Sequence, residues 1–510
     1  MEYNFSKHTV SYPDSFLDTV NEQIVDVDVT LPDYCPDIEK ILKCTLIPKV
    51  HTRVVLGGQL TIDGVSLVRI LYCDSIRHNI RSFTQTVPFS ANFSLKSTPE
   101  QYIVLCDTKC EYINCRALSP RKLVIHGAFS LSAKVVSKEQ TGFYSFDEEC
   151  DLQVKSRDIT VSDLCAICQE QFSVNEDITV SNKPPVESLL SYSVSAVITD
   201  LKSIHNKVML NAEITLKAMY IADIDSGETE HLNYVFPINR VIDCDGVTDE
   251  TVSVPLLEVM SYDLHLKNDQ MSDGTLLLLD VKLCFSEMGF LPKTLSLIDD
   301  AYSTVYITEH KREMLKCESH HSCESFTHIL KSTVKLDSVE ISKVLDVYCE
   351  SVNASPIVSD GVLSLNGKTS VCMLLKDKDN VPVYVERSVE IDCKPQLNRT
   401  FDHAQLCNCF VNSVSYRLSD ASTLELRIEL KATMLLSDSV IANPVIEVMT
   451  LEEKPVACDD CSLILYFADK GEDTWDIAKM YRTKESLLKS ENALEDNVLQ
   501  SAQMLLVPTE

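Results

Sequence analysis

Residues 59–72 read QLTIDGVSLVRILY, and residues 207–220 read KVMLNAEITLKAMY. In both stretches apolar and polar side chains alternate, and Val, Ile, Leu and Tyr are frequent, which is typical of half-buried β-strands. The tyrosines that close the two stretches lie 148 residues apart. A third stretch, residues 363–375, reads LSLNGKTSVCMLL and has Gly367 in the place of Gly64. The sequence therefore predicts three copies of one strand-rich unit.

Each copy is also expected to contain one short helix. Residues 36–42 read PDIEKIL, and proline suits the first helical position while acidic residues suit the first turn. The two isoleucines and the leucine of this segment have the spacing of one helical face. The same spacing recurs at residues 186–190 and 326–330. We therefore expect a short helix at the start of each repeat.

The period of the repeat indicates duplication of a whole domain. Solenoid units span only ~20–50 residues, whereas the tyrosines above are separated by 148. We predict a mainly β protein with three tandem β-sandwich-like repeats and a small C-terminal α+β domain. The predicted ranges are 1–19 for an N-terminal extension, 20–160, 175–312 and 315–452 for the repeats, 453–461 for a linker and 462–508 for the C-terminal domain.

Composition excludes several classes of function. The chain of 510 residues carries 46 basic and 76 acidic side chains, a net charge of −30, which disfavours binding to nucleic acid and anionic membranes. With only 12 glycines, a glycine-rich phosphate loop is not expected, and we predict no cofactor. No apolar run is long enough to span a membrane, and no signal peptide is visible. Twenty cysteines without a signal peptide are typical of a reducing cytoplasm.

The last fifty residues have a different pattern. Residues 462–467 predict a strand, and Asp473 or Thr474 can cap a helix that carries Trp475. Thr483 can cap a second helix, and residues 503–508 predict a closing strand. The predicted order is strand, helix, helix, strand. We expect Trp475, the one tryptophan of the chain, to pack in this small core, although a place at a partner surface stays open.

This C-terminal segment resembles a LysM domain through residues 471–481, which read GEDTWDIAKMY. The sequence departs from the usual LysM pattern at several positions, among them Ser501-Ala502 in place of Pro-Gly before the last strand. The resemblance implies a groove that commonly binds N-acetylglucosamine polymers, between the loops at 470–474 and 492–498. The binding residues that it implies are Gly471, Glu472, Asp473, Thr474, Trp475, Asn492, Ala493 and Leu494.

The first repeat resembles the SPOCS domain of the SipL proteins. Residues 31–42, LPDYCPDIEKIL, are similar to the opening signature of that domain, and the strand ending VRILY at 68–72 fits it. The second and third repeats lack the LPDY string. Tandem SPOCS domains followed by a LysM domain are the architecture of the SipL coat-morphogenesis proteins of spore-forming clostridia.

This resemblance implies a non-enzymatic adaptor in the cytoplasm of the mother cell. Such a protein is recruited to the forespore surface, binds the ATPase of the coat basement layer through its LysM domain, and helps the coat to encase the forespore. An alternative is a peptidoglycan-binding protein of the spore cortex or the cell wall. A second alternative is an unrecognised hydrolase within the repeats.

Motifs for catalysis and metal binding are scarce. The sequence contains no H-E-x-x-H, G-x-S-x-G or phosphate-loop motif, so we predict no catalytic residue. Cys317, His320, His321 and Cys323 have spacings that suit zinc, but the other repeats have no equivalent cluster. We therefore favour a polar loop there and predict no metal. This cluster would also be the first place to test for a hydrolase.

Two C-x-x-C pairs lie too far apart for one zinc ribbon. Cys165 and Cys168 are expected to pack in a core because Leu164 and Ile167 beside them are apolar. Cys458 and Cys461 lie in the acidic linker, where they are either exposed thiols or a disulfide that forms late in the spore coat.

Overall fold

The computed structural model describes residues 5–146, 151–181, 183–267, 275–336, 339–455 and 463–508. Almost all of this chain is antiparallel β-structure, and the described residues contain two helices, both in the C-terminal domain. The prediction of a mainly β protein is therefore confirmed. Cys458 and Cys461 lie outside the described residues.

The three repeats share one order of strand pairing. In each, the first strand pairs with the sixth and the sixth with the fifth, while the second, third and fourth form a separate sheet. The first repeat contains β1 (Phe5–Thr30), β2 (Ile38–Leu56), β3 (Gln59–Asp74), β4 (Ile80–Ser94), β5 (Tyr102–Ser119) and β6 (Lys122–Phe146). The second contains β7 (Leu152–Val180), β8 (Ser188–Ile204), β9 (Lys207–Asp223), β10 (Glu228–Asp243), β11 (Val252–Lys267) and β12 (Thr275–Ser303). The third contains β14 (Leu315–Lys335), β15 (Ile341–Ser359), β16 (Val362–Asp377), β17 (Pro382–Cys393), β18 (His403–Asp420) and β19 (Thr423–Ala442).

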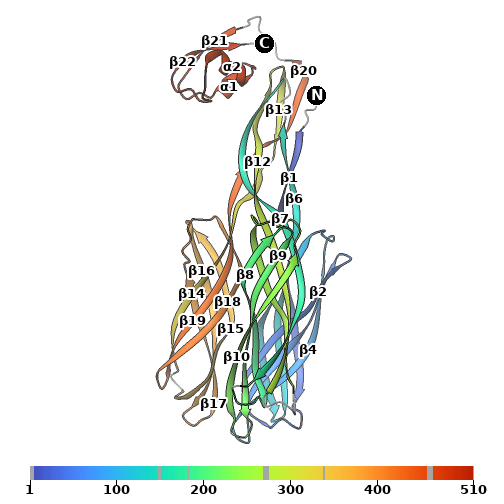
Figure 1. The fold of residues 1–510 in the computed structure, drawn as a ribbon, viewed down its shortest axis with the longest axis vertical. Coiled ribbons are helices and arrows are strands. Elements are labelled where there is room, and N and C mark those ends of the chain that lie inside the picture. The colour runs from blue at the N-terminus through green and yellow to red at the C-terminus, as the bar shows by residue number, and fades with distance from the viewer. Residues whose placement is uncertain are drawn as a thin grey trace.

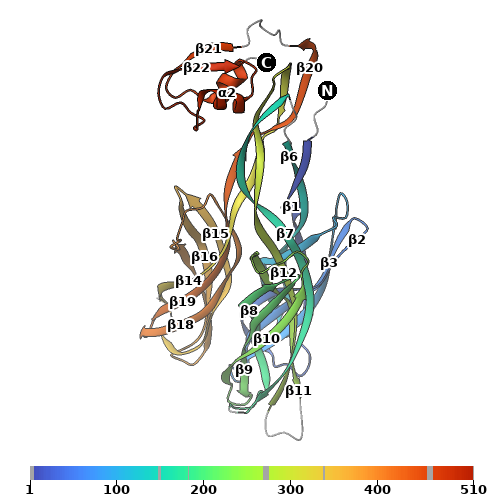
Figure 2. The ribbon, with the colours of Figure 1, turned by 45° about the horizontal axis from the view of Figure 1, so that its top comes forward.

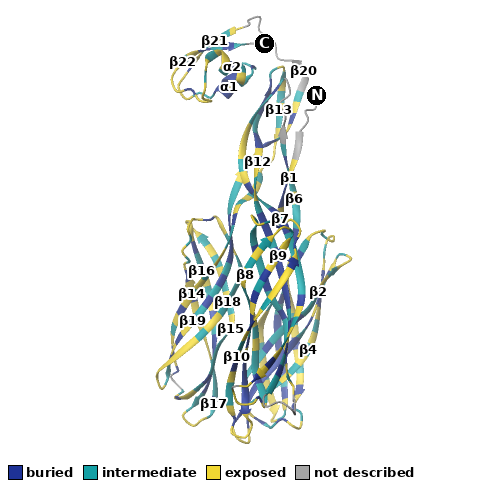
Figure 3. Ribbon diagram, in the orientation of Figure 1, coloured by how far each residue is buried: buried dark blue, intermediate teal, exposed yellow. Residues whose placement is uncertain are grey.

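The two sheets of each repeat pack against each other as a sandwich. In the first repeat, Leu60 and Ile62 of β3 and Ile125 and Leu131 of β6 belong to one buried cluster. Outward side chains alternate with these along the strands, as the burial colours of Figure 3 show. This alternation confirms the sandwich-like repeats predicted from the sequence.

Two glycines that align in the sequence occupy equivalent crowded sites. A Cβ atom added to Gly64 would lie 2.1 Å from the carbonyl oxygen of Lys49. A Cβ atom on Gly367 would lie 2.0 Å from the carbonyl oxygen of Asn353. The strand beside Gly64 bulges at His51, and at both sites the absence of a side chain allows the close backbone approach.

The short helices predicted at the start of each repeat are wrong. Residues 38–42 begin β2, and in this segment two β-bulges interrupt the pairing with β3, one at Glu39 and one at Leu42. Each bulge adds a residue and breaks the two-residue alternation of a strand. Ile38 and Ile41 consequently pack against the same core although they lie three positions apart. The bulges thus give a strand the spacing of apolar residues that is typical of a helix. Residues 188–190 and 326–330 likewise lie in strands, β8 and β14.

The bulge leucines of all three repeats meet at one place. Leu42, Leu190 and Leu345 are each the extra residue of a bulge in the second strand of their repeat. They belong to one buried cluster, the three-repeat hub, around which the sandwiches lie side by side (Figure 1). The hub consists of Leu42, Leu71, Ile80, Leu190, Met219, Ile221, Leu345 and Leu374. The third counterpart of residues 36–42 therefore begins near Ile341, and its assignment to residues 326–330 was wrong.

A β-stalk rises from one end of the sandwiches (Figures 1 and 2). The ends of β1 and β6, and of β7 and β12, extend beyond the sandwiches as long antiparallel ribbons. A third ribbon joins them, formed by β13 (Tyr306–Arg312) and β20 (Val445–Pro455). Within the described parts of the chain, no helix is both long and apolar enough to cross a lipid bilayer.

Some of the predicted domain boundaries do not coincide with the strand pairing. Residues 5–19, predicted as an extension, pair with β6 of the first repeat. Residues 152–160, predicted to close that repeat, pair with β12 of the second. Both segments contribute to the stalk.

Candidate functional site

The C-terminal domain has the predicted order of strand, helix, helix and strand. It contains β21 (Leu463–Ala468), α1 (Thr474–Met480), α2 (Glu485–Asn492) and β22 (Gln503–Pro508). Asp473 caps α1, because its side chain accepts a hydrogen bond of 2.9 Å from the backbone N–H of Trp475. Thr483 is buried between the two helices, but Lys484 is the residue before α2 and its side chain makes no capping bond. The predicted cap of the second helix is therefore wrong.

The predicted binding loop at 492–494 has mainly a structural role. The side-chain amide of Asn492 donates to the carbonyls of Leu488 and Leu506, and its oxygen accepts from the N–H of Leu506 at 2.7 Å. These bonds hold the end of α2 against β22. Leu494 packs against the domain core, whereas Ala493 is exposed and adopts a left-handed φ of 49°.

The predicted binding loop at 471–475 is largely occupied by contacts within the protein. Thr474 is buried, and its hydroxyl donates to Glu485 at 2.6 Å. Glu472 accepts a hydrogen bond of 3.2 Å from the hydroxyl of Tyr466. Gly471 is exposed, with a φ of 96° that favours glycine. The loop therefore presents few free polar groups to a ligand.

Trp475 joins the domain to the stalk. Its side chain is 4% exposed, its indole N–H donates to Asp300 at 2.9 Å, and its ring makes a T-shaped contact with the ring of Tyr302 at a centroid distance of 4.9 Å. Tyr302 belongs to the same buried cluster as the core of the C-terminal domain. The predicted packing role of Trp475 is therefore present, and it extends to a residue of β12.

Further polar contacts fix the position of the domain on the stalk. Lys155 of β7 lies 2.7 Å from the carboxylate of Asp473. The hydroxyl of Tyr302 donates to the carbonyl of Thr483 at 2.6 Å. Arg482 donates to the carbonyls of Ser303 and Tyr306. These contacts use the side of the domain that carries α1, so this side is unavailable to a partner while the domain is docked.

Asp300 is the central acceptor of this contact. Burial alone would raise its pKa, but hydrogen bonds from Lys479 and Trp475 outweigh that effect and hold the pKa of Asp300 below its ordinary value. Lys479 lies 2.6 Å from the carboxylate. His310 and Arg312 also face it, at 3.7 and 4.0 Å.

We expect the docking contact to weaken in acid. A lowered folded-state pKa stabilises the contact above the unfolded pKa of about 3.9, and this stabilisation is lost as pH falls through the folded value. The fluorescence of Trp475 should therefore change below about pH 4. Asp300→Asn, which does not titrate, should reduce this change. The part that remains is expected from Asp473, whose pKa burial would raise but its bond to Lys155 holds low. An identical acid profile in the variant would contradict the role of Asp300.

The other side of the domain is apolar and exposed. Leu463, Leu465 and Phe467 alternate along β21 and are 51%, 58% and 79% exposed. Met504, which pairs with Phe467 across the hairpin, is 52% exposed. We call these four residues the apolar face. The intervening side chains of β21 pack inward on the helices, so the sheet covers the core with one side and exposes the other.

The cluster predicted as a polar loop lies instead on β14, and that prediction was wrong. His321 is 4% exposed, stacks on Phe290 at 3.9 Å and lies 2.7 Å from Glu318. Cys323 packs beside a different buried cluster from Cys317. Among the described residues, the groups whose ligand atoms lie close enough for a metal include none of Cys317, His320, His321 and Cys323. Cys165 and Cys168 pack against the core of the second repeat, as predicted.

Two segments match the family model of the SipL SPOCS domain: residues 37–118 and residues 185–264. The first and second repeats therefore each contain a SPOCS domain. The two matches run from the start of β2 into β5 and from the start of β8 into β11, so they cover corresponding strands of the first two repeats. These tandem SPOCS domains indicate a role in sporulation. The third repeat lies outside both matches but has the same strand order.

The comparisons with curated proteins and with solved structures gave no match. The apolar face and the stalk contact were both missed in the sequence. Alternating Leu463, Leu465 and Phe467 gave a readable signal for the face. No sequence signal linked Trp475 to Asp300, because the two residues are far apart along the chain.

Proposed function

We propose that the chain is a non-enzymatic adaptor of spore-coat morphogenesis. In this proposal it acts in the mother-cell cytoplasm, binds the coat basement-layer ATPase through its C-terminal domain, and helps the coat to encase the forespore. The tandem SPOCS domains support the connection with sporulation. The resemblance of residues 471–481 to a LysM domain supports the choice of the C-terminal domain as the binding module.

The apolar face is the observation that carries the proposed interaction. Contiguous exposed apolar patches are uncommon on monomeric soluble proteins, and they often mark protein–protein interaction sites. Phe467 is the most exposed of them at 79%, and aromatic side chains are enriched among interface hot spots. The face lies on β21 and β22, away from the α1 side that contacts the stalk.

This surface differs from the groove that the resemblance implies. Asp473 and Trp475 contact the stalk, and Asn492 is bonded to α2 and β22. A ligand in that groove would have to use Gly471, Ala493 and the exposed residues after them. We therefore assign the partner contact to the apolar face.

We expect Leu465→Glu combined with Phe467→Glu to weaken the binding of the full chain to purified coat ATPase at least tenfold, measured by co-purification. Loss of a single hot-spot side chain already lowers the affinity of an interface by about that factor. Met480→Glu is the matched control, since Met480 is 64% exposed in the same domain but lies on α1. Unchanged Trp475 fluorescence would show that the domain of the double variant is still folded and docked.

Two results would contradict this assignment. If the double variant binds normally while Glu495→Lys with Asp496→Lys abolishes binding, the loop at 492–498 forms the interface. If the full chain pellets with purified peptidoglycan and does not retain the ATPase, the protein is a wall-binding protein instead.

A further inference from the structure

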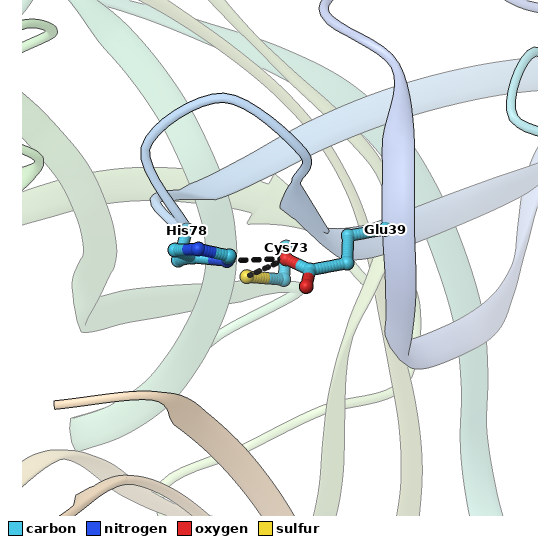
Figure 4. Close-up of side chains that lie close together, drawn as sticks. All are labelled: Glu39, Cys73 and His78. Atoms are coloured by element: carbon cyan, nitrogen blue, oxygen red, sulfur yellow. Dashed lines mark hydrogen bonds and ion pairs between the residues drawn. The ribbon is translucent and has the colours of Figure 1, made fainter. Parts of the chain in front are cut away.

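Three side chains with different ligand atoms gather at one end of the first repeat (Figure 4). They are the carboxylate of Glu39, the thiol of Cys73 and the imidazole of His78, and all three ligand atoms lie within 4.8 Å of one another. The sulfur of Cys73 is 3.8 Å from Oε2 of Glu39, and Nδ1 of His78 contacts the same oxygen.

The local structure brings these residues together. Glu39 is the extra residue of the first bulge in β2, and Cys73 lies near the end of β3, where it pairs with Lys40. His78 lies in the turn between β3 and β4 with a φ of 59°, a conformation that histidine tolerates better than most residues. Three segments of one repeat therefore converge on a single point.

A buried carboxylate holds this turn in place. Asp74 is 1% exposed, and it accepts hydrogen bonds from the backbone N–H groups of Ile76 and Arg77 at 3.1 and 2.7 Å. It also pairs with Arg81 at 3.0 Å. The position of His78 is thus set by the turn before any ligand binds.

The other repeats show that the fold does not require this set of residues. In the second repeat, Glu187 takes the place of Glu39, but its carboxylate accepts a hydrogen bond of 2.6 Å from the backbone of the turn. In the third repeat, Ser342 bonds to the carbonyl of Lys376 at 3.1 Å. The residue at this position thus makes a bond of its own in both repeats, to the turn in the second and to the end of β16 in the third.

We propose that Glu39, Cys73 and His78 bind a zinc ion. Thiolate, imidazole and carboxylate are the ligands that Zn²⁺ prefers, and a tetrahedral site places them about 3.3–3.8 Å apart. The side chains of His78 and Glu39 are 55% and 44% exposed, so water can take the fourth position. When the ion binds, the thiol of Cys73 loses its proton to solvent.

A second group of ligand atoms provides a useful contrast. The side chains of Glu350, Cys372 and Glu386 also lie within 4.8 Å of one another. The ammonium of Lys43 from the first repeat lies 2.8 Å from Glu350 and 3.0 Å from Glu386. This group already has a cation from the protein itself. Among the described residues, by contrast, no lysine or arginine forms an ion pair or hydrogen bond with the side chains of Glu39, Cys73 and His78.

The proposal is tested with full-length protein that has been stripped of metal under reducing conditions and titrated with Zn²⁺ and with Co²⁺. We expect one more equivalent to bind to the wild type than to Cys73→Ser or His78→Gln. The Co²⁺ form should show a thiolate-to-cobalt charge-transfer band that Cys73→Ser lacks. His126→Gln and Cys372→Ser are the controls, since His126 is an exposed histidine that pairs with the exposed Asp26 and Cys372 belongs to the group that holds Lys43.

Thermal unfolding with and without Zn²⁺ gives a second measurement. Binding to the folded state raises the melting temperature, so Zn²⁺ should raise it for the wild type and the controls but not for His78→Gln, each compared with its own metal-free form. Equal metal content, equal charge-transfer intensity and equal stabilisation in wild type and His78→Gln would overturn the proposal.

Discussion

Arg53→Met is expected to lower the free energy of unfolding by about 3–5 kcal/mol, because removing one partner of a buried ion pair leaves the other charge unpaired. Arg53 of β2 lies 2.7 Å from Glu258 of β11, and the two side chains are 3% and 19% exposed. Arg53 also donates to the carbonyl of Val104 at 3.0 Å. The pair therefore crosses the boundary between the first and second repeats, where Met260 packs into the core of the first.

The pH dependence and a double variant test this cause. Burial raises the pKa of Glu258 despite the nearby Arg53, and loss of the arginine should raise it further. A raised folded-state pKa gives stability that is lost as pH rises, so the penalty should shrink as pH falls toward about 4.3. Arg53→Met with Glu258→Leu should recover most of the loss in urea unfolding. A double variant as unstable as the single one would show that packing, and not charge, dominates.

Leu190→Ala is expected to destabilise the protein by about 2–5 kcal/mol, which is the usual range for a buried leucine that leaves a cavity. Leu190 is 1% exposed and lies in the three-repeat hub, in one cluster with Leu42 and Leu345. The cavity would therefore affect the contact of all three sandwiches. Urea unfolding should show a lower midpoint, and limited proteolysis should release separate repeats earlier than in the wild type.

Leu118→Ala provides the control, because Leu118 is 64% exposed in the first repeat and surface substitutions usually change stability by less than about 0.5 kcal/mol. If Leu190→Ala is no more destabilising than this control, the hub does not hold the repeats together.

The strands were predictable from the sequence because apolar and polar side chains alternate along them as the side chains alternate between buried and exposed positions. The stretches around Gly64 and Gly367 lie in the third strand of their repeats, where one side faces a core. The helix predictions failed at Glu39 and Leu42 because a bulge changes the face of every later side chain, and sequence spacing alone does not distinguish a bulged strand from a short helix.

The candidate site was only partly predictable. Asp473 was recognised as a helix cap, because capping depends on residues close in sequence. The contact of Trp475 with Asp300 depends on tertiary structure and left no local pattern. The zinc ligands Glu39, Cys73 and His78 are spread over two strands and a turn, so their spacing does not resemble a sequential metal motif.

The stalk fixes the distance between the three sandwiches and the apolar face of the C-terminal domain. Its ribbons are continuous antiparallel pairs, in which backbone hydrogen bonds restrict bending far more than in a glycine- or serine-rich tether. A partner held by Phe467 and its neighbours would therefore stand at a set height from the sandwiches. If many copies bound one polymerising layer, the sandwiches of all copies would lie at the same distance from that layer.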